Sequence, residues 1–343
     1  MTAATTPAAR RTQLWLWLAT GALLVVIALS FATGKFAISP LAILAALVEK
    51  LTGRADLVSA DVRLVVWQVR APRVLAAVLV GAALSGAGAT YQGLFRNPLV
   101  SPDILGVAAG AGLGAITGIY LDLPIAAIQV LAFAGGLVAV LIVYGVGASI
   151  RSRDPVLALV LAGVAVGTLL GAATSMLKIF ADPYNQLPAM TYWLLGSLTA
   201  VTPGDLLSAA PAVALGLLPL VSLRWRMNVM SLGDEEARAL GIESTRLRAV
   251  FVAAATLMTA AAVSIAGVVG WVGLIVPHAA RLLVGPDYSR LLPLSLILGA
   301  GFLVFADTIA RVIAVTEVPL GSVTAVVGAP GFLWLLGTGR RGW

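Results

Sequence analysis

Few residues in this chain could carry out chemistry. Its 343 residues include a single histidine, His278, and no cysteine. Histidine clusters and thiolates are the usual protein ligands of zinc and related metals, so a site of that kind is not expected. The phosphate-binding pattern G-x-x-x-x-G-K-[ST] is also absent, because the one Gly-Lys pair, Gly34-Lys35, is followed by Phe36. The sequence therefore predicts no metal or cofactor site and no catalytic residue in this chain.

The segment 224–248 is the one strongly charged stretch, with five arginines and four acidic residues. Its centre, from Ser231 to Gly241, reads SLGDEEARALG. Asp234 is a suitable N-cap, acidic residues fill the first turn, and Gly241 suits the position after a helix end. We therefore expect a surface helix of about two turns. It would be either a solvated connector or an element that inserts into a groove of a partner protein.

The remaining acidic residues tend to lie near the ends of apolar runs, as do Asp103, Asp122, Asp182, Asp205 and Asp307. A carrier driven by a proton or sodium gradient usually places ionisable side chains in the middle of its spans. The pattern makes an ion-coupled secondary transporter the less favoured alternative. If the protein moves a substance uphill, the energy is expected to come from another subunit.

The elements that position these residues are expected to be apolar helices. The chain is 60% hydrophobic and only 11% charged, with a mean hydropathy of +1.02, whereas soluble domains carry about 25% charged residues. This composition excludes an ordinary water-soluble protein and predicts an all-α polytopic membrane protein. The net charge of +7 is then expected to reflect basic loops on the cytoplasmic face and not nucleic-acid binding.

Ten stretches lack Asp, Glu, Lys and Arg and approach the roughly 20 residues that span a bilayer. They are 12–34, 74–95, 104–121, 123–150, 155–177, 183–204, 206–223, 249–280, 291–306 and 318–339. Prolines interrupt the run 183–204, and glycines interrupt 249–280. Two arrangements of ten transmembrane helices are therefore open. Either 183–204 is a short re-entrant or periplasmic helix and 249–285 holds two spans, or each of these regions holds one span.

The distribution of basic residues separates the two arrangements. With the N-terminus inside, the first places 14 Lys and Arg inside and eight outside, whereas the second places nine inside and 13 outside. Cytoplasmic loops carry an excess of Lys and Arg, so we choose the first. Both termini are then cytoplasmic. A tail covers 1–12, a single transmembrane domain covers 13–339, and a second tail covers 340–343.

Three arginines face outward in this arrangement, against the general bias: Arg70, Arg73 and Arg311. Two roles are open for them. They could anchor helix ends among lipid headgroups, or they could dock a soluble partner that presents carboxylates, with which arginine forms planar bidentate pairs.

The charged segment resembles a known family. Glu236-Ala237-Arg238-Ala239-Leu240-Gly241 is similar to the coupling loop of ABC-importer permeases, in which a Glu-Ala pair precedes a glycine and the loop docks into the ATPase subunit. Eight further stretches resemble the FecCD-type permeases for iron-siderophores, haem and cobalamin, which are membrane subunits of type II importers. They keep the family's order over about residues 60–336: Arg70-Ala-Pro-Arg73 with Gly81–Gly86, Gln92–Leu99, Ser101–Gly106, Leu161–Gly163, Tyr192-Trp193, Gly273–Arg281, Ala306–Arg311, and Glu317–Gly321 with Gly328–Pro330.

The resemblance implies an assembly in the bacterial inner membrane. Two permease subunits would enclose a central path, two ATPase subunits would bind ATP and Mg, and a periplasmic binding protein would deliver the cargo. We expect a homodimer of permeases, because nothing in the chain suggests a fused second half.

The resemblance also implies roles for particular residues. Coupling to the ATPase is expected from Leu232, Gly233, Asp234, Glu236, Ala237, Arg238 and Gly241. Docking of the binding protein is expected from Arg70, Arg73 and Arg311, since similar permeases use arginines there to meet glutamates on its two lobes. The translocation path is expected to involve Tyr192, Trp193 and Ser197.

The favoured cargo is a ferric chelate. Asn97-Pro-Leu-Val-Ser-Pro-Asp103 looks closer to siderophore permeases than to haem permeases, so a ferric siderophore ranks first, haem second and cobalamin third. A large cargo that is already chelated needs a wide path with few fixed ligands, in keeping with a sequence that lacks metal-binding clusters. Two hypotheses from other functional classes remain: an ion-coupled secondary carrier and a membrane scaffold or receptor that transports nothing.

Overall fold

The computed structural model describes residues 7–54, 57–150 and 155–338. Within them the chain is helical and contains no strand. In chain order the elements are α1 (Pro7–Ala32), α2 (Pro40–Thr52), α3 (Ala60–Leu64), a π-helical turn η1 (Val65–Arg70), α4 (Ala71–Leu94), a 3-10 turn η2 (Pro102–Leu105), α5 (Val107–Tyr120), α6 (Ile125–Ser149), α7 (Pro155–Phe180), α8 (Gln186–Leu194), α9 (Pro203–Ser222), α10 (Arg224–Met230), α11 (Asp234–Ala239), α12 (Ser244–Ala266), α13 (Val272–Val284), α14 (Tyr288–Val312) and α15 (Leu320–Thr338).

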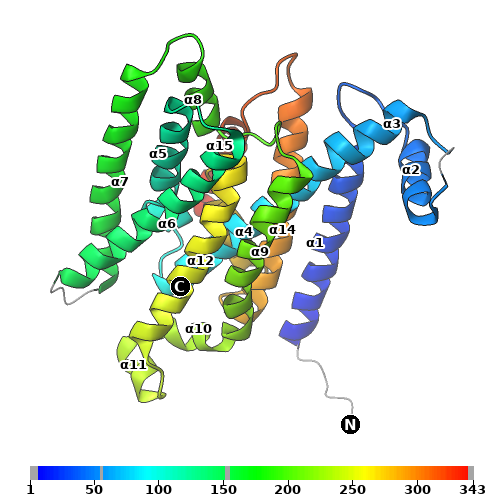
Figure 1. The fold of residues 1–343 in the computed structure, drawn as a ribbon. Coiled ribbons are helices and arrows are strands. Elements are labelled where there is room, and N and C mark those ends of the chain that lie inside the picture. Colours follow the sequence, from blue (N-terminus) through cyan, green and yellow to red (C-terminus); the bar gives the residue numbers. More distant parts are fainter. Residues whose placement is uncertain (1–6, 55–56, 151–154, 339–343) are drawn as a thin grey trace.

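Helix α4 lies at the centre of the bundle and buries most of its side chains (Figure 1). Helices α9, α12, α13 and α14 pack around it. The approach of α14 is so close that a Cβ on Gly81 would lie 2.2 Å from the carbonyl oxygen of Gly299. Small residues at such crossings let helix backbones meet, which is how helices associate in a lipid environment. The buried Tyr91 hydroxyl bonds to Thr256 Oγ1 at 2.9 Å, so this core leaves that hydroxyl satisfied.

Seven of the described helices are long and apolar enough to cross a membrane. Three shorter apolar helices accompany them, Val107–Tyr120, Val272–Val284 and Leu320–Leu335. The expectation of an all-helical membrane bundle is therefore confirmed. The count of ten spans stays a prediction, because the three shorter helices fall below the length that by itself indicates a span.

The two regions that separated the alternative arrangements follow the first of them. Residues 183–202 contain the short helix α8, and the region 249–285 is divided into α12 and α13. The division occurs at Gly267, whose φ of +67° belongs to the left-handed region. A Cβ on Gly267 would also lie 2.3 Å from the carbonyl oxygen of Trp193. The glycine therefore permits both the break and the close passage of α8.

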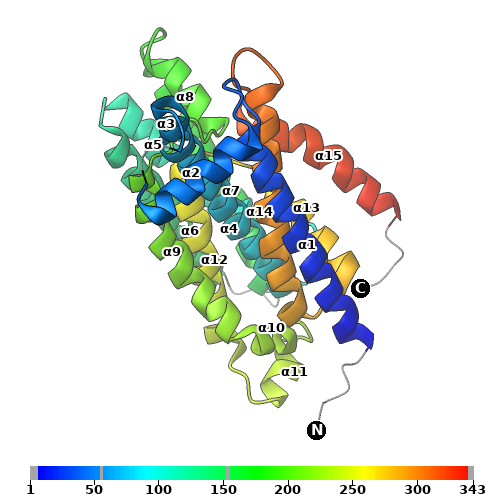
Figure 2. The ribbon, with the colours of Figure 1, turned by 90° about the vertical axis from the view of Figure 1, so that its right-hand side faces the viewer.

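The bundle has two distinct ends. Helices α10 and α11 lie at one end, here called the inner end, and α2, α3 and α8 lie at the opposite, outer end (Figure 1). Helix α1 begins at the inner end and runs toward the outer end (Figure 2). The charged segment 224–248 therefore shares an end with the start of α1, as the charge count requires. The predicted tail 340–343 lies outside the described residues.

Two helix boundaries differ from the predicted runs. Helix α1 begins at Pro7, so residues 7–12, predicted as part of a polar tail, are helical; proline is favoured at the first helical position and alanine in the next turn. The helix that holds α4 extends back to Ala60 through η1. There the Ala71 N–H donates to Val66 O, five residues earlier, and the wider turn accommodates Pro72, which has no N–H to donate.

Candidate functional site

The charged segment 224–248 forms α10, α11 and the first residues of α12 at the inner end. We call it the coupling segment after the role that the family resemblance implies for it. The predicted surface helix is present as α11, although it is only six residues long. Its N-cap is Gly233 and not Asp234 as predicted. Gly233 has a φ of +139°, a conformation that side chains disfavour, and Asp234 therefore takes the first helical position. The side chain of Asp234 lies outside the described part of the chain.

Gly241 ends α11 as predicted, with a φ of +78°. Its N–H donates to Arg238 O at 2.9 Å, and the N–H of Ile242 donates to Ala237 O at 2.9 Å. These two bonds form a Schellman motif, which satisfies carbonyls left over at a helix end. No described atom lies within 4 Å of a Cβ built on Gly241. The requirement for glycine is therefore conformational and not steric.

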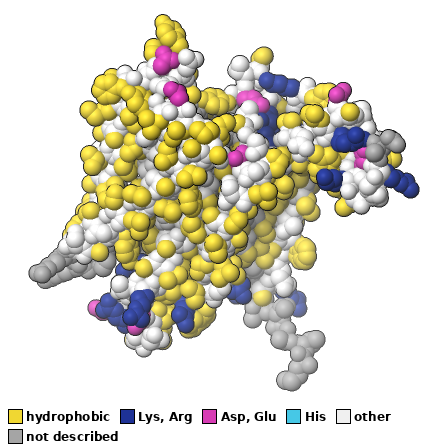
Figure 3. Space-filling model, in the orientation of Figure 1, with side chains coloured by type: hydrophobic (Ala, Val, Ile, Leu, Met, Phe, Trp, Pro, Cys, Tyr) yellow, Lys and Arg dark blue, Asp and Glu magenta, His cyan; other side chains and the backbone are white. Residues whose placement is uncertain are grey.

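The coupling segment presents charged and apolar groups together to its surroundings. Glu236 and Arg238 are exposed, whereas Ala237 is buried against the bundle. Leu232 and Leu240 are 57% and 59% exposed. Acidic and basic atoms gather over this region at the lower left of Figure 3. Exposed leucines ringed by charges are typical of a surface that another protein covers.

Asn228 ties the coupling segment to α14. Its Nδ2 donates to Asp287 Oδ1 at 2.7 Å, and its Oδ1 accepts from the N–H of Tyr288 at 2.7 Å. Asp287 is the N-cap of α14 and accepts from the N–H of Ser289 at 2.9 Å. Two hydrogen bonds thus join α10 to the first turn of α14. A displacement of α10 would therefore be transmitted to α14.

At the outer end of α14, Asp307 lies between two arginines. Its Oδ1 is 2.9 Å from Arg73 Nη2, and its Oδ2 is 3.2 Å from Arg311 Nε. The carboxylate is almost fully buried. A buried charge is costly unless it is paired and hydrogen-bonded. The two guanidinium groups supply that pairing, and the one of Arg73 also holds α4 against α14.

Glu317 extends this cluster to the loops of the outer end. Its Oε2 lies 2.9 Å from Arg73 Nη1 and accepts from Thr199 Oγ1 at 2.6 Å. Thr199 in turn shares a hydrogen bond with Ser197 Oγ at 2.8 Å. We call these six residues the outer network: Arg73, Asp307, Arg311, Glu317, Thr199 and Ser197. It joins α4, α14, the loop 313–319 and the loop after α8.

The surroundings of Glu317 favour its charged form. Burial by itself raises the pKa of this carboxyl, but the hydrogen bond from Thr199 and the positive charge of Arg73 act in the opposite direction. The net result is a pKa below the ordinary value of 4.5. Glu317 is therefore ionised at neutral pH.

The three predicted docking arginines lie at the outer end, as expected, but they are not on the surface. Arg70, Arg73 and Arg311 are only 3%, 6% and 7% exposed. Arg70 donates to the carbonyl oxygens of Phe31 and Phe36, and Arg311 Nη2 donates to Ser30 Oγ at 2.6 Å. Their role in docking a binding protein stays a prediction, since none of the three guanidinium groups is exposed in this arrangement of the chain. Each one is occupied by groups of its own protein.

The predicted path residues lie on α8 and in the loop that follows it. Tyr192 is exposed, and Trp193 is half-buried. Ser197 donates its N–H to Ala266 O at 2.8 Å, at the end of α12. Of the three, only Ser197 belongs to the outer network. The sequence did not predict this connection.

Sequence reasoning missed four residues of these sites: Asp307, Glu317, Thr199 and Asn228. One signal was available, because Asp307 and Arg311 are four positions apart in a helix, a spacing that brings opposite charges together. Nothing comparable marks the other three, whose partners lie far away in the sequence.

Within the described residues, no group of three His, Cys, Asp or Glu side chains could hold a metal ion. His278 packs edge-on against Phe332, with ring centroids 5.9 Å apart. This contact packs α13 against α15.

Comparisons with known proteins identify the family of this chain. The family described as the FecCD transport family matches residues 22–338. The chain is 46% identical, over 80% of its length and 73% of the relative's, to the cobalamin import system permease protein BtuC of Halobacterium salinarum. It is 42% identical, over 80% of its length and 82% of the relative's, to a probable iron chelatin transport system permease protein of Helicobacter pylori.

A solved structure shares the fold. It is described as an inward-facing conformation of a metal-chelate type ABC transporter, and it superposes with a TM-score of 0.84 at 32% identity. The match covers 94% of this chain and 98% of the other.

Proposed function

The chain belongs to the FecCD transport family and is the permease subunit of a type II ABC importer, and we propose that the cargo it moves is a ferric chelate. A ferric siderophore ranks before haem. The motif Asn97–Asp103 and the iron chelatin relative support this choice. Cobalamin is the alternative to a ferric chelate, because a relative of similar identity carries that name.

We propose that the coupling segment carries the ATPase contact. Leu232 and Leu240 would enter an apolar groove of the partner, with Glu236 and Arg238 at its rim. Gly233 and Gly241 set the two ends of α11, and Ala237 anchors it to the bundle. ATP and Mg would be bound by the partner alone, and this chain would supply only the surface that moves with it.

The observation that carries this proposal is the position of α14. Asn228 holds its inner end to the coupling segment, and Asp307 holds its outer end to Arg73 and Arg311. Motion of the ATPase subunits would therefore tilt a helix whose two ends are both hydrogen-bonded. In this way closure of the partner subunits would change the outer end of the path.

Docking of a periplasmic binding protein is proposed at the outer network. Glu317 is its most accessible charged member, with 23% of the side chain exposed. A carboxylate on the binding protein would compete with Glu317 for Arg73, and with Asp307 for Arg311. Arg70 would keep its structural bonds and add to the positive potential. Docking would then loosen the contacts that close the outer end.

A second permease subunit, most simply a copy of this chain, is proposed to face α7. Its Gly167 and Gly171 have no described atom within 4 Å of an added Cβ, and Leu161 and Val164 are exposed beside them. Small residues allow the close helix approach that such a contact in the membrane needs. The path would run between the two copies, lined in part by Tyr192 and Trp193 of α8.

The test is uptake into proteoliposomes that contain the permease, its ATPase and its binding protein. A ferric siderophore, haem and cobalamin are supplied in parallel. In each case ATP is present on the side of the membrane that carries the ATPase. We expect ATP-dependent uptake of the ferric siderophore. Uptake of cobalamin alone would replace the proposed cargo, and uptake driven by an ion gradient without the ATPase would contradict the importer mechanism.

A further inference from the structure

Helix α2 is inverted relative to an ordinary surface helix. Its outward side is apolar and consists of the exposed residues Leu41, Leu44, Leu47, Val48 and Leu51. Leu41 and Leu51 are 78% and 77% exposed, whereas the charged Glu49 is only 6% exposed. A helix on a water-facing surface places its charges outward and its leucines inward. Helix α2 does the reverse over most of its length.

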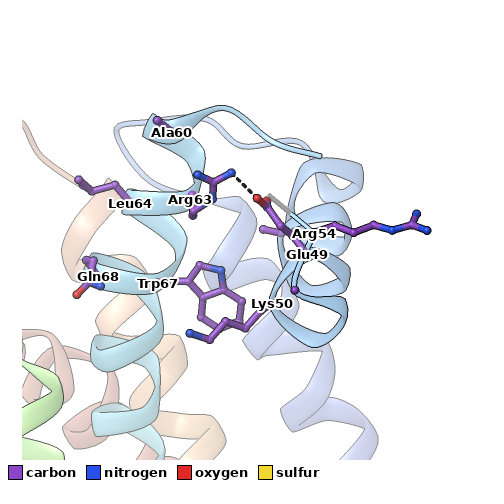
Figure 4. A pocket seen from close by; sticks show the side chains of 10 residues that line it. Glu49, Lys50, Arg54, Ala60, Arg63, Leu64, Trp67 and Gln68 are labelled. Atoms are coloured by element: carbon purple, nitrogen blue, oxygen red, sulfur yellow. Dashed lines mark hydrogen bonds and ion pairs between the residues drawn. The ribbon is translucent and has the colours of Figure 1, made fainter. Parts of the chain in front are cut away.

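The charges on the protein-facing side are paired within the outer end. Arg63 Nη2 of α3 donates to Glu49 Oε1, and Lys50 Nζ lies 5.7 Å from the ring centroid of Trp67. Figure 4 shows these side chains converging between α2 and the helix that leads into α4, with Arg54 directed away from them. Together they line a cavity of about 510 Å³. Glu49 therefore already has an ionic partner, whereas Lys50 remains exposed although it lies near Trp67. The leucine side of α2 has no partner among the described residues.

The position of α2 beside α1 indicates the environment of its leucines. In both views α2 lies level with the outer part of α1 and beside it, not beyond its end (Figures 1 and 2). Helix α1 is a candidate span with few buried residues, and its Leu24, Val25 and Leu29 are exposed. The leucine side of α2 thus lies at the level of an apolar belt that faces lipid.

The charges near the end of α2 fit the same environment. Lys50 and Arg54 are exposed at its C-terminal end. Glu49, Lys50, Arg54 and Arg63 line the cavity, and one negative and three positive groups leave a net charge of +2. Amphipathic helices that lie in a bilayer interface combine an apolar side with Lys and Arg that meet lipid phosphates. Both parts of that pattern are present.

We propose that α2 is an interfacial helix of the outer leaflet. Its leucines enter the acyl-chain boundary, and Lys50 and Arg54 bind the phosphate groups of lipids, with anionic headgroups preferred. Fixed in this way, α2 anchors the outer ends of α1 and α4 to the membrane surface. The proposal does not depend on the cargo or on the ATPase.

Immersion is tested by spin labels, which the absence of cysteine makes direct. Leu44→Cys is labelled in the full-length permease in nanodiscs. Leu24→Cys on α1 serves as the lipid-exposed control, and Val315→Cys, which is 90% exposed in the loop after α14, serves as the water-exposed control. We expect the ratio of oxygen to nickel-chelate accessibility at position 44 to match that at 24 and to exceed that at 315 several-fold. A ratio like that at 315, or protection from both reagents through cover by a second copy, would overturn the proposal.

Headgroup binding is tested by thermal unfolding in nanodiscs of phosphatidylcholine with and without phosphatidylglycerol. We expect phosphatidylglycerol to raise the Tm of the wild-type chain, and the double variant Lys50→Gln/Arg54→Gln to lose most of that shift. Lys178→Gln, which removes one positive charge at the outer end of α7, should retain it. An equal shift in the double variant would refute the role of the two cations, whereas the spin-label ratio would still decide immersion.

Discussion

The Nε of Arg73 donates to both oxygens of Asp307, at 3.0 and 3.1 Å, although the two residues are 234 positions apart in the chain. The pair joins the central helix α4 to the outer end of α14. At the other end of α14, Asn228 bonds to Asp287. The 25 residues of α14 cover about 37 Å at a rise of 1.5 Å per residue. One helix therefore connects the coupling segment with the outer network.

Asp307→Asn is expected to destabilise the protein. The change leaves the buried Arg311 without a compensating carboxylate and leaves Arg73 with Glu317 alone, and loss of one partner of a buried ion pair costs about 3–5 kcal/mol. The measurement is thermal unfolding in nanodiscs. Glu243→Gln is the control, because its pair with Arg246 is exposed and such pairs contribute less than about 1 kcal/mol. Equal stability of the two variants would show that the outer network does not hold the bundle together.

The stability of the outer end is expected to fall in acid because of Glu317. Its pKa in the folded protein is below the value of 4.5 that it has when unfolded, so above pH 4.5 the full contribution is present. As the pH falls below 4.5 the unfolded state takes up the proton first, and the contribution is lost on the way to the lower folded pKa. The free energies of unfolding of the wild type and of Glu317→Gln, plotted against pH, should therefore converge as the pH falls. Parallel curves down to the lowest accessible pH would contradict this.

Gly241→Ala is expected to weaken coupling to the ATPase. Its φ of +78° costs an alanine roughly 1 kcal/mol or more, and relief of that strain would undo the Schellman end of α11. The measurement is ATP hydrolysis by the assembled transporter with and without its binding protein. Gly241→Asn should retain more of the stimulation, since asparagine tolerates the left-handed region. Full stimulation in the alanine variant would mean that the end of α11 does not matter for coupling.

Asn228→Ala is expected to separate hydrolysis from transport. The change removes both hydrogen bonds to the first turn of α14 and leaves the exposed part of α11 intact. The ATPase should still bind and hydrolyse ATP, while the amount of cargo taken up per ATP falls. Ser231→Ala is the matched control, because its hydroxyl bonds only to the carbonyl of Asn228 nearby. An unchanged ratio of uptake to hydrolysis would exclude α14 as the connecting element.

Several features followed from the sequence because their causes are local. Long apolar runs produced the membrane helices, since backbone groups in lipid must be satisfied within each segment. Gly241 ended α11 where its position in the charged segment predicted, because a left-handed residue suits that turn. Prolines in 183–204 and glycines in 249–280 left two arrangements open, and the distribution of Lys and Arg chose the one in which α8 is short and α12 and α13 are separate.

Other features could not be predicted, because they depend on packing between distant segments. The expected outward side of Arg70, Arg73 and Arg311 did not indicate whether their guanidinium groups are exposed or buried. Whether a guanidinium group at a helix end faces solvent depends on which residues the neighbouring helices bring to it. The inverted helix α2 was missed for a related reason. Its 13 residues are too few to span a membrane, and the lipid contact of its leucines can be inferred only from its position beside α1.

The sequence by itself determined the membrane class, the charged coupling segment and the resemblance to a permease family, since composition, charge and motif order can be read along the chain. The tertiary structure decided how those parts act on one another. It placed Asp307 between Arg73 and Arg311, connected Ser197 to Glu317 through Thr199, and attached Asn228 to Asp287. These contacts form only when packing brings distant residues within hydrogen-bond distance, because the free energy of burying a charge is favourable only where a partner is already in place.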